Sequence, residues 1–250
     1  MPVVKPAGNP SATDRECMAR AIAAAGEVRC ITAPNPWVGA VLRTDEGDLF
    51  SGATSEPGGP HAEVNALEAA GDRARGATLY VTLEPCSHQG RTPPCVDAIR
   101  AAGVSRVVVG IEDPDPLVAG KGIEALGNAG LEVDLGVQAE QVRNQLAAYL
   151  THRSTGRPHV VLKLAATLDG GTAAPNGTSQ WITSPEARAD GHRLRAESDA
   201  ILVGAGTVRR DNPSLTVRDY RPPVLPASGS VDPRRVVLGS VPAEALVRPC

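Results

Sequence analysis

The chain has 250 residues, more than a single domain usually holds, so the sequence predicts two units. Apolar residues make up 42% of the chain but aromatic residues only 2%, which favours α/β domains whose cores consist of small aliphatic side chains. The formal net charge of −3, without a block of Lys or Arg, argues against a nucleic-acid partner and favours a small-molecule substrate.

Residues 1–14 are rich in Pro and polar side chains, and we expect them to form a flexible N-terminus. They lack the apolar core of a signal peptide. No later window approaches the roughly 18 continuous apolar residues of a membrane-spanning helix. We therefore expect a cytoplasmic protein with no membrane partner.

Strand and helix patterns alternate in the next part of the chain, which we take as one domain, 15–150. The expected helices cover residues 16–25, 62–70, 96–102, 122–129 and 138–150, and the expected strands cover 38–42, 77–83 and 106–110. Such alternation predicts helices that cover a sheet.

A polar stretch, 151–158, contains Gly156 and Pro158 and is expected to be a linker. A second domain, 159–250, would begin with a strand at 160–164 and contain further strands at 200–203 and 234–238. We expect this domain to be partial, because no closing element follows its last strand.

Three side chains of metal-binding type, His61, Cys86 and Cys95, are expected at or near the starts of two helices. GPHAEVNAL places His61 and Glu63 at one start, while Cys86 follows a strand and Cys95 begins the next helix. Residues two apart inside a helix face opposite sides, so we expect His61 at the N-cap. The partial positive charge of helix N-termini favours thiolates. One imidazole and two thiolates are typical of a catalytic zinc site whose fourth position is open to water.

Glu63 is the candidate for proton transfer at this site. Two thiolates neutralise the formal charge of Zn²⁺, so a nearby base is needed to activate water. Zinc deaminases contain a His-x-Glu motif followed by Pro-Cys-x-x-Cys, and their Glu transfers protons without binding the metal. In this chain eight residues, rather than two, separate Cys86 from Cys95.

HAEVNAL and TLEPCSHQGRTPPC resemble the deaminase domain of the bifunctional riboflavin-biosynthesis family, in which a long loop between the cysteines is usual. The similarity runs from Arg15 to Leu150 and includes NPWVG and DPDPLVAGKG. It implies a cytidine-deaminase-like α/β/α sandwich that binds Zn²⁺ and deaminates a diaminopyrimidinone carrying a phosphoribosylamino group. The implied metal ligands are His61, Cys86 and Cys95, and the implied proton carrier is Glu63.

The same resemblance assigns residues to the substrate. Asn35 matches an asparagine that lines the base pocket. His88 and Arg91, in the loop between the cysteines, are candidates for binding the phosphate. Thr54 departs from the family, since many relatives have a histidine there.

From Arg157 onward, RPHVVLKLAATLDGGTA, TSQWITSPEAR and LRAESDAILVGAGTVRRDNPSLTVR resemble the reductase domain of the same family. The resemblance implies a dihydrofolate-reductase-like α/β fold and NADPH as cofactor. The positions that match nucleotide contacts are Ala165, Trp181, Thr207 and Asp211, and those that match substrate contacts are Ser179, Arg195, Leu215 and Arg218. We expect this partial domain not to oxidise NADPH.

Other interpretations remain open. His88 could complete a structural zinc site, which would make the unit a non-catalytic scaffold. A nucleic-acid base deaminase is a further alternative, although the charge balance does not favour it. We expect Cys17, Cys30 and Cys250 to be inert core residues of a protein in a reducing compartment. The sequence is compatible with a homo-oligomer but does not settle the state of assembly.

Overall fold

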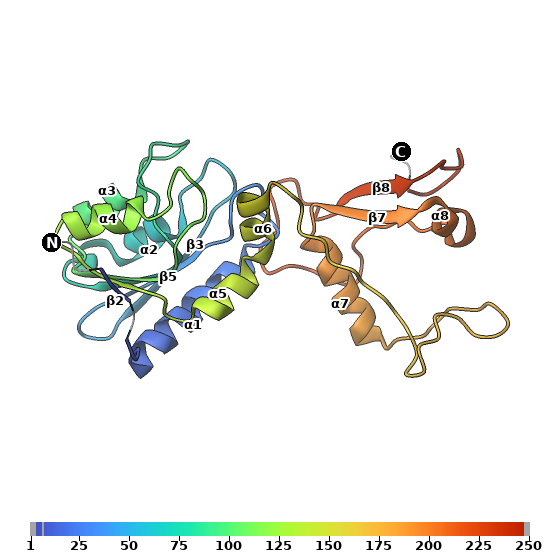
Figure 1. Cartoon of the computed structure of the whole chain (residues 1–250), viewed down its shortest axis with the longest axis horizontal. Coiled ribbons are helices and arrows are strands. Elements are labelled where there is room, and N and C mark those ends of the chain that lie inside the picture. The colour runs from blue at the N-terminus through green and yellow to red at the C-terminus, as the bar shows by residue number, and fades with distance from the viewer. Residues whose placement is uncertain (1–3, 7, 248–250) are drawn as a thin grey trace. The chain divides into compact units, whose positions relative to one another are not determined.

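The computed structural model describes residues 4–6 and 8–247 and divides the chain into two units, Met1–Val160 and Val161–Cys250 (Figure 1). Each unit is described by itself. Cys250, expected to be an inert core residue, lies outside the described residues. No described helix is long and apolar enough to cross a membrane.

A six-stranded sheet forms the centre of the first unit, with the order β1-β6-β5-β4-β2-β3. The strands are β1 (Val4–Pro6), β2 (Gly39–Arg43), β3 (Leu49–Ala53), β4 (Thr78–Leu83), β5 (Arg106–Ile111) and β6 (Glu132–Leu135). β2 is antiparallel to both β3 and β4, whereas the pairs β4–β5, β5–β6 and β6–β1 are parallel. The carboxyl ends of β4 and β5 therefore meet at one edge of the sheet.

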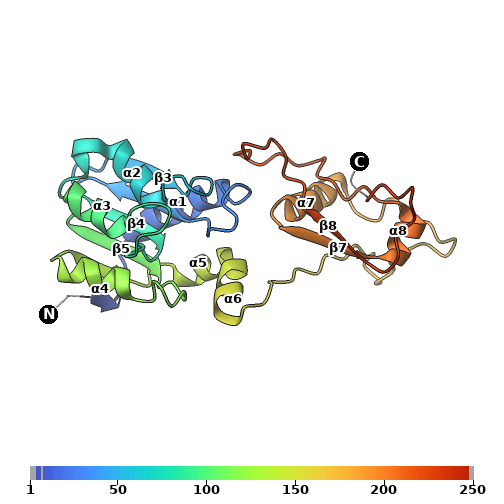
Figure 2. The same ribbon diagram turned by 90° about the horizontal axis from the view of Figure 1, so that it is seen from above.

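Helices cover both faces of this sheet. α1 (Ala12–Glu27) and α5 (Ala139–Gln145) lie on one face, while α2 (Ala62–Ala70), α3 (Cys95–Ala102) and α4 (Lys121–Asn128) lie on the other (Figures 1 and 2). A 3₁₀ helix, η1 (Gly71–Ala74), follows α2, and α6 (Ala147–Thr155) follows α5.

Alternate residues of the central strands pack against opposite layers. Those in the core with α2, α3 and α4 are Ala40, Leu42, Leu79, Val81, Val107 and Val109. Their neighbours in the core with α1 are Val41, Tyr80 and Val108. The α/β/α sandwich expected for the first unit is confirmed.

Gly52 on β3 allows the first turn of α2 to lie directly against the sheet. A Cβ atom at this position would lie 2.3 Å from the carbonyl oxygen of Ala62 and 2.4 Å from the backbone nitrogen of Ala66. No side chain larger than hydrogen fits without moving the helix. The glycine therefore permits the close contact between β3 and the start of α2.

The expectation of a flexible N-terminus over residues 1–14 is wrong for two parts of it. Val4–Pro6 pairs in parallel with β6 as the outermost strand of the sheet. Ser11 caps α1 through a capping box with Asp14, whose carboxylate also accepts hydrogen bonds from Tyr80 (3.0 Å) and Arg106 (2.8 Å). The partners β6, Tyr80 and Arg106 lie far from residues 1–14 in the sequence, so the local composition does not predict these contacts.

Asp14→Asn is expected to lower stability at neutral pH and to weaken the pH dependence of unfolding in acid. Burial alone would raise the pKa of Asp14, but hydrogen bonds from Arg106, Ser11 and Tyr80 outweigh it and lower the pKa from 3.8 to about 2. The carboxylate therefore stabilises the fold above pH 3.8, and this contribution is lost as the pH falls toward 2. The contribution is on the order of 2 kcal/mol.

Urea unfolding of the parent and of Asp14→Asn at pH 7, 4 and 2 measures this effect. The difference in unfolding free energy should shrink between pH 4 and pH 2. A difference that stayed constant over this range would show that the ionised form of Asp14 does not stabilise the fold.

The second unit contains α7 (Pro185–Ala196), β7 (Ala200–Gly204), α8 (Ala205–Asp211) and β8 (Arg234–Leu238). β7 and β8 pair in parallel and are the only strands among its described residues. Ser184 caps α7 by accepting a hydrogen bond from the backbone N–H of Ala187.

Two expectations near the junction are wrong. Residues 151–155 were expected to be linker but form the end of α6. The strand expected at 160–164 is absent, and Val160, Leu162 and Leu164 are 80%, 80% and 73% exposed. This segment has the composition of a strand, but a strand also needs a pairing neighbour, and no described strand pairs with it.

Candidate metal centre

The start of α2 presents His61 and Glu63 to the same region. His61 is the N-cap and has an extended backbone conformation (φ −78°, ψ 167°), as the spacing of the two residues predicted. Glu63 lies in the first helical turn and is only 3% exposed. In a continuous helix the side chains of His61 and Glu63 would face opposite sides. Because the backbone of His61 is extended, both side chains can face the same site.

The two cysteines come from separate elements that are hydrogen-bonded to each other. Cys86 lies three residues after β4, and Cys95 is the first residue of α3. The backbone N–H of Cys95 donates to the Sγ atom of Cys86 (3.4 Å), and the N–H of Val96 donates to the carbonyl oxygen of Cys86 (3.2 Å). The start of α3 is therefore attached to the loop that carries Cys86.

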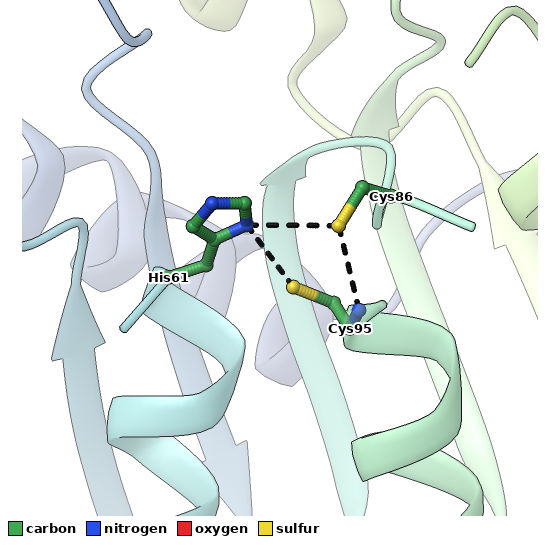
Figure 3. A group of neighbouring side chains, drawn as sticks. All are labelled: His61, Cys86 and Cys95. Atoms are coloured by element: carbon green, nitrogen blue, oxygen red, sulfur yellow. Dashed lines mark hydrogen bonds between the residues drawn. The ribbon is translucent and has the colours of Figure 1, made fainter. Parts of the chain in front are cut away.

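His61, Cys86 and Cys95 bring one nitrogen and two sulfur atoms within 4.8 Å of one another. The Nδ1 atom of His61 lies 3.2 Å from the Sγ atom of Cys95 and 3.6 Å from that of Cys86 (Figure 3). Typical zinc–nitrogen and zinc–sulfur bonds in tetrahedral geometry place ligand atoms about 3.5–3.8 Å apart. The donor set and its spacing fit a zinc ion with three protein ligands.

The protonation of the two thiols supports this interpretation. A hydrogen bond from Cys95 lowers the pKa of the Cys86 thiol against the opposing effect of burial, and His61 lowers it further. The pKa of Cys95 is raised by its hydrogen bond to Cys86, by burial and by Glu63. The opposite shifts of the two pKa values reflect two neighbouring sulfur atoms that compete for one negative charge, and a divalent cation would stabilise both as thiolates.

Glu63 interacts with the three candidate ligands but does not belong to their group. Burial raises its pKa to about 7, although the charge of His61 opposes this and that of Cys86 adds to it. A carboxyl group that titrates near neutral pH can both accept and donate a proton. Its environment fits an acid–base group better than a fourth metal ligand.

His88 does not complete the site. Its side chain is exposed, and it is not part of any metal-binding group among the residues that the structure describes. Thr92 is a neighbour that the sequence did not indicate: its Oγ1 atom lies 3.5 Å from the Nε2 atom of His61, the ring nitrogen that faces away from the sulfurs. A partner at this nitrogen helps to orient a metal-binding imidazole.

The other residues assigned to the first site lie in the loops of the first unit. Asn35 is half-buried in a bend, where its backbone N–H donates to the carbonyl oxygen of Thr32 (2.8 Å). Arg91 is exposed in the loop between the cysteines. Thr54, which replaces the family's histidine, is buried, and its hydroxyl accepts a hydrogen bond from the N–H of Val38 (3.1 Å).

In the second unit, Arg195 and Arg218 both donate hydrogen bonds to Thr216, the residue that follows Leu215. The Arg195 guanidinium donates to the carbonyl oxygen of Thr216, next to the buried Leu215. The Arg218 guanidinium donates to the hydroxyls of Ser214 (2.6 Å) and Thr216 (3.1 Å). Burial lowers the pKa of Arg195, and the charge of Arg218 lowers it further. Two neighbouring guanidinium groups suit a phosphate-bearing ligand.

The remaining residues assigned to the second unit are more exposed. Ser179, Trp181, Thr207 and Asp211 are exposed, and Ala165 is half-buried. The Trp181 ring packs under the Arg188 guanidinium, 4.2 Å from the ring centroid. Thr207 and Asp211 both lie on α8.

Two family models match the chain. Residues 11–111 match the cytidine and deoxycytidylate deaminase zinc-binding region, and residues 158–247 match the RibD C-terminal domain. The first match contains the three candidate ligands and Glu63, and the second contains Arg195 and Arg218.

The chain is also similar to longer proteins. It is 47% identical over 232 residues to the riboflavin biosynthesis protein RibD of Escherichia coli, a match that covers 91% of this chain and 63% of that protein. The RibD protein of Mycobacterium tuberculosis is 47% identical over 239 residues, which are 93% of this chain and 68% of that protein. The chain thus spans less than two thirds of the length of the first of these relatives.

A solved structure has the same fold. The diaminohydroxyphosphoribosylaminopyrimidine deaminase/5-amino-6-(5-phosphoribosylamino)uracil reductase of Thermotoga maritima superposes with a TM-score of 0.80 at 42% sequence identity. The match covers 90% of this chain and 63% of that one.

Proposed function

Because the chain belongs to the RibD family, we propose that its first unit catalyses a zinc-dependent hydrolytic deamination in riboflavin biosynthesis. The proposed substrate is 2,5-diamino-6-(5-phosphoribosylamino)pyrimidin-4(3H)-one, and the products are 5-amino-6-(5-phosphoribosylamino)uracil and ammonia. The observation that carries the proposal is the group of His61, Cys86 and Cys95 with a buried carboxyl group, Glu63, beside it.

The chemistry divides between the metal and Glu63. Zinc, when bound, supplies positive charge that makes water a stronger acid. A Glu63 carboxylate oxygen accepts a proton from the attacking water and passes it to the leaving amino nitrogen. A carbon–oxygen bond forms, the carbon–nitrogen bond breaks, ammonia leaves, and Glu63 returns to its starting state.

We assign substrate recognition to residues in the surrounding loops. Asn35 would bind the pyrimidine base, while His88 and Arg91 would bind the phosphate. Support for the phosphate assignment is that both side chains are exposed between the two cysteine ligands. A guanidinium makes charge-assisted hydrogen bonds to phosphate oxygens.

Ammonia release by zinc-loaded protein tests the proposed function. We expect release from the phosphoribosylated diaminopyrimidinone but not from cytosine in a single-stranded oligonucleotide. Release from the oligonucleotide alone would favour a nucleic-acid base deaminase. Absence of release from both substrates would favour a zinc-stabilised scaffold.

We further propose that the second unit carries the elements of an NADPH-dependent reductase acting on the deaminated product. Its match to the RibD C-terminal domain and the pairing of Arg195 with Arg218 near Thr216 support this proposal. Ala165, Trp181, Thr207 and Asp211 would bind the nucleotide. Ser179 and Leu215 would join the two arginines at the substrate.

A polypeptide of these 250 residues is nevertheless expected not to oxidise NADPH. The second unit leaves apolar side chains of its described strands exposed, with Leu202 at 58% and Leu238 at 63%. These exposed side chains leave part of the described strands without packed support, which a cofactor site needs. NADPH absorbance and ammonia release should be followed in one reaction, in which only ammonia is expected to change. NADPH oxidation that depends on deamination would contradict this prediction.

A cytoplasmic location and a small-molecule partner also belong to the proposal. The two candidate thiolate ligands are free cysteines that a reducing compartment would keep reduced, which supports the location. We do not expect nucleic acid or membrane as partners. A homo-oligomer remains compatible with the proposal and can be tested by sedimentation.

A further inference from the structure

Glu84 has a buried carboxylate that accepts hydrogen bonds from four backbone N–H groups. Glu84 lies between β4 and Cys86 and is only 4% exposed. The Oε2 atom accepts hydrogen bonds from the N–H groups of Asp113 (3.2 Å) and Gly120 (2.9 Å). The Oε1 atom accepts from those of Gly122 (2.8 Å) and Ile123 (3.2 Å).

These amides belong to the loop before α4 and to the first turn of that helix. α4 has no side-chain cap of its own, since its N-cap residue is Gly120. Glu84 therefore satisfies the free N–H groups of the helix from a distant segment. Among the described residues, the hydrogen-bond donors to the Glu84 carboxylate are these four backbone N–H groups and no Lys, Arg or His side chain.

The same contact reaches the metal centre through Pro85. A Cβ atom on Gly122 would lie 1.9 Å from the carbonyl oxygen of Pro85, so the start of α4 packs tightly against the residue that precedes Cys86. Beyond Pro85, the carbonyl and Sγ of Cys86 accept the N–H groups of Val96 and Cys95. The start of α4, the segment from Glu84 to Cys86 and the start of α3 thus form one hydrogen-bonded chain.

We propose that Glu84 is a positioning residue of the metal centre. By holding four amides of the α4 region, it fixes the backbone from which Cys86 reaches the metal, and it thereby maintains the spacing of Cys86 and Cys95. The inference rests on the proposed zinc site. Besides capping the start of α4, the Glu84 carboxylate would thus raise the affinity of the site for zinc.

The first test compares Glu84→Gln with Glu112→Gln. The amide of a glutamine presents N–H groups to two of the four donors, so the Glu84 variant cannot satisfy all of them. We expect its zinc dissociation constant, measured by competition with a chelator, to rise about 10–100-fold. Glu112 is exposed in the loop before α4, and the same substitution there should leave the zinc affinity unchanged.

The spectrum of bound Co²⁺ distinguishes positioning from general stabilisation. We expect the ligand-field bands of the Glu84→Gln protein to shift relative to the parent, because the Cys86 thiolate moves. Lower thermal stability with unchanged zinc affinity and an unchanged cobalt spectrum would overturn the inference. Failure of the parent itself to bind zinc would instead refute the proposed function.

A second measurement needs no variant and applies even if Glu84→Gln does not fold. Coupling between two sites is reciprocal, so zinc should slow hydrogen exchange of the amides bound to Glu84. We expect peptides covering residues 113–123 to gain more protection on zinc binding than peptides from α1. Equal protection of both regions would overturn the inference.

Discussion

Cys95→Ser is expected to abolish zinc binding and ammonia release together. A serine hydroxyl stays protonated at neutral pH and is a poor ligand for zinc compared with a thiolate. Cys95 is fully buried at the start of α3, and its Sγ atom lies 3.2 Å from the Nδ1 atom of His61. Zinc affinity should therefore fall by more than the roughly 10–100-fold typical of an outer-shell substitution.

Metal analysis of dialysed protein measures this result. The parent should hold one zinc per chain, and Cys95→Ser should hold almost none. Cys30→Ser is the matched control, because Cys30 lies outside the group of ligands. Full zinc content in Cys95→Ser would show that the ligand assignment is wrong.

Glu63→Gln is expected to retain zinc and to lose deamination by about 10²–10⁴-fold, the usual contribution of general acid–base catalysis. The amide keeps the shape of the side chain but cannot accept the proton that water must release. Zinc content should be unchanged, since Glu63 does not belong to the ligand group. The two variants should thus separate metal binding from proton transfer.

Glu68→Gln provides the control for this variant. Glu68 lies on the same helix, α2, and is exposed, so the same substitution should leave the rate near that of the parent. Turnover at a near-parental rate in Glu63→Gln would reduce Glu63 to a structural carboxylate at a helix start.

The features that could be predicted from the sequence are those that depend on local spacing. The helix at 62–70 has the predicted bounds, and His61 is its N-cap. Both observations follow from apolar periodicity and the geometry of helix starts. The resemblance of the two halves to one bifunctional family is confirmed by the two family models and the RibD relatives.

The features that sequence analysis missed depend on partners far along the chain. Two strands of the first sheet, β3 and β6, were not predicted. Both are short, and Ser51 and Gly52 weaken the strand pattern of β3. Glu84 binds amides 29 to 39 residues away, and Thr92 lies 31 residues from its neighbour His61. No local pattern reports such pairings, and the roles of the substrate-binding residues stay predictions.

The most direct test of the central claim is deamination in water enriched in ¹⁸O. Zinc-loaded protein should release one ammonia for each uracil product formed, and each product molecule should carry one ¹⁸O atom. Chelator-treated protein should do neither until zinc is restored. Ammonia release without incorporation of ¹⁸O, or no release by fully zinc-loaded protein, would contradict hydrolysis at the site of His61, Cys86 and Cys95.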